Sequence, residues 1–172
     1  MLSTRMGFFR PRRGLRMTLS TVVLALQVGC GGGGSQATPA PAPRPSLDDV
    51  TRTTFAPELG VDIATMSRRP SGLYVQELRA GTGAVAYRDR TAVVRYIGWL
   101  ANGKEFDRGE VPVKLGAGEV IRAWEEGVLG MRVGGVRRLV TPPNLAYGSR
   151  GSGNTIPADA VLVFEMQLVD VR

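Results

Sequence analysis

The sequence predicts an α+β domain of about 100 residues, with several antiparallel strands, one short helix and two long loops. Apolar and polar residues alternate, as they do in strands, in several short segments after residue 70. Asn102-Gly103, a strong hairpin signal, follows the longest of these segments. Residues 116–130 instead carry a helical pattern. Its apolar members are Val120, Ile121, Trp124, Val128 and Leu129.

Residues 1–29 are interpreted as an export signal. An arginine-rich start precedes an apolar run from Met17 to Val28, which is too short for a permanent membrane span. Cys30 follows this run and resembles the lipidated cysteine of bacterial lipoproteins, although Gln27 stands where that motif usually has leucine. We therefore expect lipidation of Cys30. The alternatives are an ordinary secretory signal, a twin-arginine signal, and a start at Met17.

Two segments connect this signal to the domain. Residues 30–49 are rich in Gly, Ser, Ala and Pro, bury too little apolar surface to fold, and are predicted to be a flexible tether. Residues 50–69 carry scattered apolar residues without a clear period, so we predict a partly ordered or extended lead-in at the domain edge. The domain itself is placed at residues 70–172.

Strands make up most of the predicted domain. In chain order they are residues 72–78, 91–100, 104–107, 111–115, 135–141 and 160–171. The helix between the fourth and fifth strands is weakened by Gly127, and Gly130 can end it in a left-handed turn. A glycine-rich loop is predicted at 144–158, and Arg137-Arg138 is interpreted as a solvated strand face.

The composition excludes several classes of function. The net charge is +7, but from Cys30 onward 17 basic side chains face 15 acidic ones, which gives no electrostatic case for a nucleic-acid partner. The sequence has one cysteine and no histidine. It therefore offers no intrachain disulfide, no His-ligated metal and no Ser-His or Cys-His nucleophile pair, and we expect neither a metal nor a cofactor.

Six motifs follow one another in residues 70–172. They are VRYIGWL at 94–100, NGKEFD at 102–107, LGAGEVIRAWEEG at 115–127, AYG at 146–148, IP at 156–157 and LVFE at 162–165. Taken together and in this order, these motifs resemble the FKBP family of macrolide-binding peptidyl-prolyl cis-trans isomerases. The resemblance implies a curved antiparallel β-sheet wrapped around one short α-helix, with a proline pocket between them.

The resemblance also implies the residues of the site. The catalytic set would be Tyr96, Phe106, Asp107, Trp124, Tyr147 and Phe164, and the substrate-binding set Val111, Val120, Ile121 and Ile156. Trp124 would form the pocket floor. The Ile121 backbone N–H and the Tyr147 hydroxyl would donate to peptide carbonyls, while Asp107 would orient Tyr96. The alternative roles are structural: packing for the aromatic residues and a turn for Asp107.

The sequence departs from the family pattern between Asp107 and Val111. Only Arg108-Gly109-Glu110 intervenes, where family members carry a longer bulged segment, and Val111 replaces an expected aromatic residue. The shorter segment raises the alternative that Asp107 is held differently. We predict a more open pocket wall, lower activity and an altered preference for the residue before proline.

These residue types suit the rotation of X-Pro bonds, because that reaction makes no bond to a heavy atom and requires no nucleophile or base. We expect a monomeric isomerase that assists the folding of exported, proline-containing polypeptides at the bacterial cell envelope. The lipid would hold it at the outer membrane or the periplasmic face rather than in the cytoplasm. The alternatives are a non-catalytic proline-binding module or chaperone on the same fold, and a structural lipoprotein.

Overall fold

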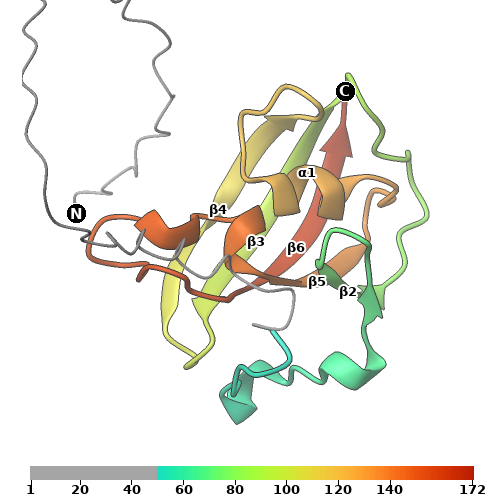
Figure 1. The fold of residues 1–172 in the computed structure, drawn as a ribbon. Helices are drawn as coiled ribbons and strands as arrows, with labels where there is room; N and C mark the ends of the chain where they lie inside the picture. Colours follow the sequence, from blue (N-terminus) through green and yellow to red (C-terminus); the bar gives the residue numbers. More distant parts are fainter. Residues whose placement is uncertain (1–49) are drawn as a thin grey trace, which may run out of the picture. The chain divides into compact units, whose positions relative to one another are not determined.

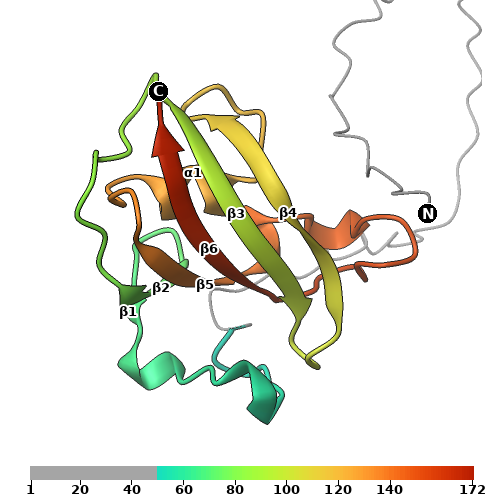
Figure 2. The ribbon, with the colours of Figure 1, turned by 180° about the vertical axis from the view of Figure 1, so that it is seen from behind.

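The computed structural model describes residues 50–172, so the predicted signal, Cys30 and the tether lie outside the described residues. The described part is a curved six-stranded antiparallel sheet with one short helix across one face (Figures 1 and 2). The predicted fold class is therefore confirmed. Within residues 50–172, no helix has the length and apolar character needed to cross a membrane.

The strand order in the sheet is β1-β2-β5-β6-β3-β4, which places β5 and β6 at the centre and β1 and β4 at the edges. The strands are β1 (Ser67–Arg68), β2 (Tyr74–Arg79), β3 (Thr91–Leu100), β4 (Glu105–Lys114), β5 (Val136–Thr141) and β6 (Leu162–Val171). The helix α1 spans Arg122–Val128. Short 3-10 turns lie at Pro57–Leu59, Ile63–Thr65, Pro143–Leu145 and Gly148–Arg150.

Most of the predicted strands match these bounds, but two that were expected to be separate are one. Residues 104–107 and 111–115 were predicted as two strands, whereas β4 is continuous from Glu105 to Lys114. The residues between them stay in register with β3, with Gly109 opposite Tyr96. Pairing along the whole length of β3 therefore outweighs the weak strand preference of a glycine, which a local pattern cannot show.

The helix α1 has seven residues and begins after Ile121, so it is shorter than the helical pattern in the sequence. A helix of this length depends on packing for its stability. At Gly127 a side chain could not be accommodated, because an added Cβ would lie 2.3 Å from Leu139 Cδ1 on β5. The glycine that weakens the helix in isolation therefore allows it to lie close to the sheet.

Arg137 on β5 ties the C-terminal end of α1 to the sheet. Its guanidinium donates hydrogen bonds to the carbonyls of Gly127 (2.7 Å) and Leu129 (3.2 Å), and forms an ion pair with Glu77 on β2 (2.7 Å). The interpretation of Arg137 as a solvated residue is wrong, since it is only 8% exposed. Carbonyls at a helix end lack intrahelical donors, and this buried arginine supplies two.

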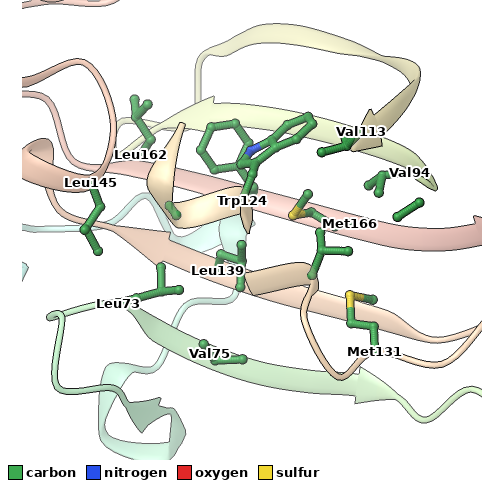
Figure 3. Close-up of a cluster of buried hydrophobic side chains, with 14 of the residues drawn as sticks. Leu73, Val75, Val94, Val113, Trp124, Met131, Leu139, Leu145, Leu162 and Met166 are labelled. Atoms are coloured by element: carbon green, nitrogen blue, oxygen red, sulfur yellow. The ribbon is translucent and has the colours of Figure 1, made fainter. Parts of the chain in front are cut away.

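Apolar side chains cover both faces of the sheet. The larger cluster fills the space between the sheet and α1, with Trp124 among the surrounding leucine, valine and methionine side chains (Figure 3). The second cluster lies on the opposite face, because its strand members alternate with those of the first. Its buried members are Val50, Leu59, Met66, Tyr74, Val140, Val161 and Val163.

Residues 50–69 contribute to this second cluster and are not a simple extended lead-in. The Ala56 N–H donates to the carbonyl of Ala101 in the β3–β4 hairpin (2.8 Å), and Arg138 donates to the carbonyl of Gly60 (2.9 Å). The folded unit therefore includes residues before position 70. A period-based prediction misses such a segment because its contacts are made by scattered side chains and not by a repeating face.

Candidate active site

Four aromatic rings from four different elements meet between the sheet and α1. Tyr96 (β3) and Trp124 (α1) have ring centroids 4.5 Å apart at an interplanar angle of 70°. Phe164 (β6) lies 5.6 Å from Trp124 at 90°, and Phe106 (β4) lies 5.7 Å from Phe164 at 87°. These are edge-to-face contacts, the arrangement that aromatic rings favour. The sequence-based set thus converges into one aromatic cluster, defined here by these four residues.

A β-bulge explains why neighbouring residues of β4 both reach this cluster. Asp107 pairs with Gly98, and the register shifts there so that Phe106 is the additional residue on β4. In a regular strand Phe106 and Asp107 would face opposite sides of the sheet, whereas a bulge turns both to the same side. The hairpin therefore delivers a ring and a carboxylate together, even though the segment before Val111 is short.

Gly98 is a residue of the site that the sequence analysis did not identify. A Cβ at this position would lie 2.7 Å from Phe106 Cζ and 3.0 Å from Phe164 Cε1. The two phenylalanine rings therefore occupy the space that any other residue would need. The sequence shows Gly98 inside the motif of residues 94–100. The reason for a glycine within this strand appears only once β3, β4 and β6 are paired.

Polar groups line one side of the aromatic cluster. The Tyr96 hydroxyl donates a hydrogen bond to Asp107 Oδ2 (2.7 Å). Burial, this hydrogen bond and the nearby negative charge of Asp107 together raise the pKa of Tyr96 well above its ordinary value. The pKa of Tyr147 is also raised, first by burial and then by the charge of Asp107, which places Tyr147 near the same carboxylate. Both phenols therefore remain protonated donors at neutral pH.

Besides the buried indole N–H of Trp124, two hydrogen-bond donors near the aromatic cluster have no acceptor among the described residues. The Ile121 backbone N–H, at the residue before α1, forms no hydrogen bond within residues 50–172, and neither does the Tyr147 hydroxyl. Ile121 and Val120 are half-buried against the larger apolar cluster, while Tyr147 is 36% exposed. These two donors are the ones that the sequence analysis assigned to peptide carbonyls.

The remaining sequence-based residues are placed less favourably for direct contact with a ligand. Val111 is half-buried and packs beside the larger apolar cluster. Ile156 is only 2% exposed and exchanges backbone hydrogen bonds with Ser152 in the loop, so its place in the substrate-binding set stays a prediction.

The aromatic cluster itself is nearly closed. Trp124 is 6% exposed and Phe164 is 2% exposed. Two hollows lie elsewhere: one of about 300 Å³ beside Tyr96 and Gly109, and one of about 360 Å³ near Arg122 at the start of α1. Neither is lined by Trp124. A proline ring would therefore contact the indole only after half-buried neighbours move aside.

Comparisons with known proteins agree with this geometry. The family model for FKBP-type peptidyl-prolyl cis-trans isomerases matches residues 83–169, which contain all four rings of the aromatic cluster. The chain belongs to this family. An FK506-binding protein of Neisseria meningitidis is 41% identical over 105 residues, covering 58% of this chain and 96% of that protein.

Two further FKBP relatives define how much of the chain is shared. FK506-binding protein 4 of Mycosarcoma maydis is 46% identical over 112 residues, which are 63% of this chain but only 30% of that longer protein. The crystal structure of AtFKBP13 matches with a TM-score of 0.59 and 33% identity, covering 62% of this chain and 98% of that one. The prediction of an FKBP-type peptidyl-prolyl isomerase is thus confirmed by the family model, and the relatives and the structural neighbour carry FKBP names.

Proposed function

We propose that this FKBP-type protein accelerates the rotation of X-Pro bonds in exported polypeptides and so assists their folding at the bacterial cell envelope. The observation that carries the proposal is the pair of unused donors, the Ile121 N–H and the Tyr147 hydroxyl, beside the aromatic cluster. Nothing in the fold requires these donors. They suit a ligand that presents carbonyl groups next to an apolar ring, which describes a proline-containing peptide.

Rotation of an X-Pro bond requires no reactive side chain, only an apolar environment around the amide. Rotation of a peptide bond crosses a barrier of about 18–20 kcal/mol because the planar amide is stabilised by resonance. Water favours the planar form by hydrogen bonding to the amide oxygen, so an apolar site that removes water and fits the twisted amide lowers the barrier. The aromatic cluster would hold the proline ring, and the two donors would position the flanking carbonyls.

Replacing Tyr147 by Phe tests this proposal with little effect on the fold. The hydroxyl forms no hydrogen bond within the described residues, so Tyr147→Phe should leave the urea unfolding midpoint unchanged. The loss of one donor to the peptide should lower kcat/KM about fivefold in a direct assay of X-Pro isomerisation, the effect of roughly 1 kcal/mol. An unchanged kcat/KM in a protein that is otherwise active would contradict the assigned role.

Trp124 needs a more conservative variant than alanine. Because the indole is 6% exposed, Trp124→Ala would leave a cavity and cost about 3–5 kcal/mol of stability, which confuses function with folding. Trp124→Phe keeps an apolar ring and is the better test of the pocket floor. Competition by a macrolide, suggested by the name FK506-binding protein that the relatives carry, would test whether the same site is used.

A non-catalytic proline-binding module or chaperone is the second candidate, and the nearly closed aromatic cluster favours it. The indole offers little open surface, and the segment between Asp107 and Val111 is short. Both assays on the wild-type protein separate the two candidates. If the protein fails to accelerate isomerisation yet still suppresses aggregation of an unfolded client, the chaperone function is the correct one.

The proposed location rests on the N-terminal sequence alone. The apolar run before Cys30 and the tether after it are the supporting features. We propose that Cys30 carries a lipid that holds the isomerase at the outer membrane or the periplasmic face. Cys30→Ser should then move the exported protein from the membrane fraction to the soluble fraction. Unchanged membrane fractionation of this variant would rule out the lipid anchor.

A further inference from the structure

The outer edge of β4 carries backbone groups that no strand of the described chain uses. Within residues 50–172, β4 has β3 as its only neighbour in the sheet. The Leu115 N–H donates to the carbonyl of Arg90 (3.0 Å). In an antiparallel pair the backbone groups of successive residues point alternately toward and away from the partner strand, so every second residue counted back from Leu115 bonds to β3. The backbone groups of Gly109 therefore point toward β3, while those of Arg108 and Glu110 point away from it, at the sheet edge.

This free edge adjoins the candidate active site. Asp107 and Phe106, which belong to the site, directly precede Arg108 on the same strand. The hollow of about 300 Å³ lies beside the same residues of β4. It is lined by Tyr96 and Gly109 together with Arg95, Ile97, Arg108 and Glu110. The last four alternate with residues that face α1, so the hollow opens on the other face of the sheet.

This hollow is lined by apolar surface and by charged side chains that already form ion pairs. Ile97 is half-buried but belongs to neither apolar cluster of the domain. Its charged neighbours are paired: Arg95 with Glu110 (2.8 Å) and Arg108 with Glu105. An occupant would therefore be selected by its backbone and by apolar side chains, and not by its charge.

We infer that the β4 edge at Arg108 and Glu110 binds an extended segment of the client polypeptide, next to the proline held at the aromatic cluster. This inference rests on the proposed function. A segment added as a strand would exchange backbone hydrogen bonds with the edge, independently of its sequence. Alternate side chains would point toward the active-site face and toward the hollow at Ile97.

Pro112 limits the length of this interaction. Its missing N–H falls on the open edge, where proline is tolerated because no ladder bond to β3 is lost. A paired segment can thus accept hydrogen bonds from the backbone N–H groups of Arg108 and Glu110, but not from position 112, where proline has no N–H. Proline and charged residues at an edge also discourage uncontrolled strand pairing, so the edge can bind a short client segment without acting as a template for aggregation.

The central experiment removes one backbone N–H from the open edge of β4. A second variant that loses the same side chain but keeps the N–H is the control. Glu110→Pro deletes the edge N–H, while Glu110→Ala removes the same carboxylate and keeps the N–H. Two kinds of substrate share one X-Pro core: a short peptide of about four residues, and peptides lengthened on one side or the other to about ten residues. Each added residue extends a strand by about 3.4 Å.

For the wild-type protein, at least one lengthened peptide should show a lower KM than the short one. Glu110→Pro should raise that KM about fivefold relative to the KM of the short peptide, whereas Glu110→Ala should not change this ratio. Equal effects of Glu110→Pro on short and long peptides would overturn the inference, because they would indicate distortion of the active site. So would the absence of any gain from lengthening.

Hydrogen exchange on the wild-type protein provides a test that depends on no variant and on no turnover. Binding of a lengthened peptide should slow exchange of the Arg108 and Glu110 amides; unchanged exchange at saturation would overturn the inference. If the wild-type protein does not isomerise the short peptide, the proposed function fails separately from this result. A dimer in sedimentation that Glu110→Pro dissociates would assign the edge to a second copy and overturn client binding.

Discussion

Substitution of Gly98 by alanine is the most direct test of how the strands position the aromatic cluster. An added Cβ would lie 2.7 Å from Phe106 Cζ and 3.0 Å from Phe164 Cε1. Phe164 is 2% exposed and packed on all sides, whereas Phe106 is half-buried and lies closer to the added Cβ, so Phe106 is the ring that should be displaced. The substitution therefore pushes one wall of the site outward while changing no polar group.

The expected loss of stability follows from two opposing terms. Overpacking of a well-filled site costs about 1–3 kcal/mol. Replacing a glycine by alanine restricts the unfolded chain and returns about 0.4–1 kcal/mol. The net expectation for Gly98→Ala is a loss of about 1–2 kcal/mol in the free energy of unfolding, together with a fall of about fivefold or more in kcat/KM as the Phe106 wall shifts.

Gly109 provides the matched control on the neighbouring strand. A Cβ there would lie 3.5 Å from Tyr96 Cε1, an ordinary van der Waals contact. Gly109→Ala should therefore keep only the favourable term and leave the protein as stable as the wild type or slightly more stable. Urea unfolding of both variants measures the difference. A Gly98→Ala variant as stable as Gly109→Ala would refute the packing argument.

Three further predictions concern pH, the helix end and the N-terminal segment. The pKa of Tyr96 is raised above its unfolded value of 10.0, so folding favours the protonated phenol; its contribution to stability is present below about pH 10 and is lost as the pH rises further. Urea midpoints between pH 8 and about pH 11 should fall less in Tyr96→Phe than in the wild type, and equal falls would contradict this assignment. Arg137→Ala should lower the free energy of unfolding by about 2–4 kcal/mol, because two helix-end carbonyls lose their donor; a loss below about 0.5 kcal/mol in chemical denaturation would show that water replaces the guanidinium. A protein lacking residues 50–69 should bind a hydrophobic dye and unfold at lower urea than one beginning at Val50, because the second apolar cluster is exposed; matching midpoints would show that this segment adds no stability.

Local patterns in the sequence were sufficient for much of the fold. The alternation in residues 91–100 defined β3 without error, and Asn102-Gly103 located the hairpin, where Gly103 has the positive φ of 85° that such a turn requires. These features depend on residues close in sequence. The order of motifs around Trp124 and Tyr147 likewise predicted a set of site residues, and four aromatic rings of that set lie together in the structure.

Other features depend on partners that are distant in the chain, and local patterns missed them. Arg137 resembled a solvated strand residue, but the end of α1 and Glu77 surround its guanidinium. Residues 50–69 showed no period because they cover one face of a sheet built from later strands.

The sequence by itself determined most of the strands, the helix and the chemical character of the predicted site, because backbone propensity and side-chain type are properties of neighbouring residues. Only the tertiary structure decided how the site is assembled. The bulge that turns Phe106 and Asp107 to one side, and the space that Gly98 leaves for two rings, arise from the pairing of β3 with β4 and β6. Such spacing is set by excluded volume between chain segments far apart in sequence, which no local pattern encodes.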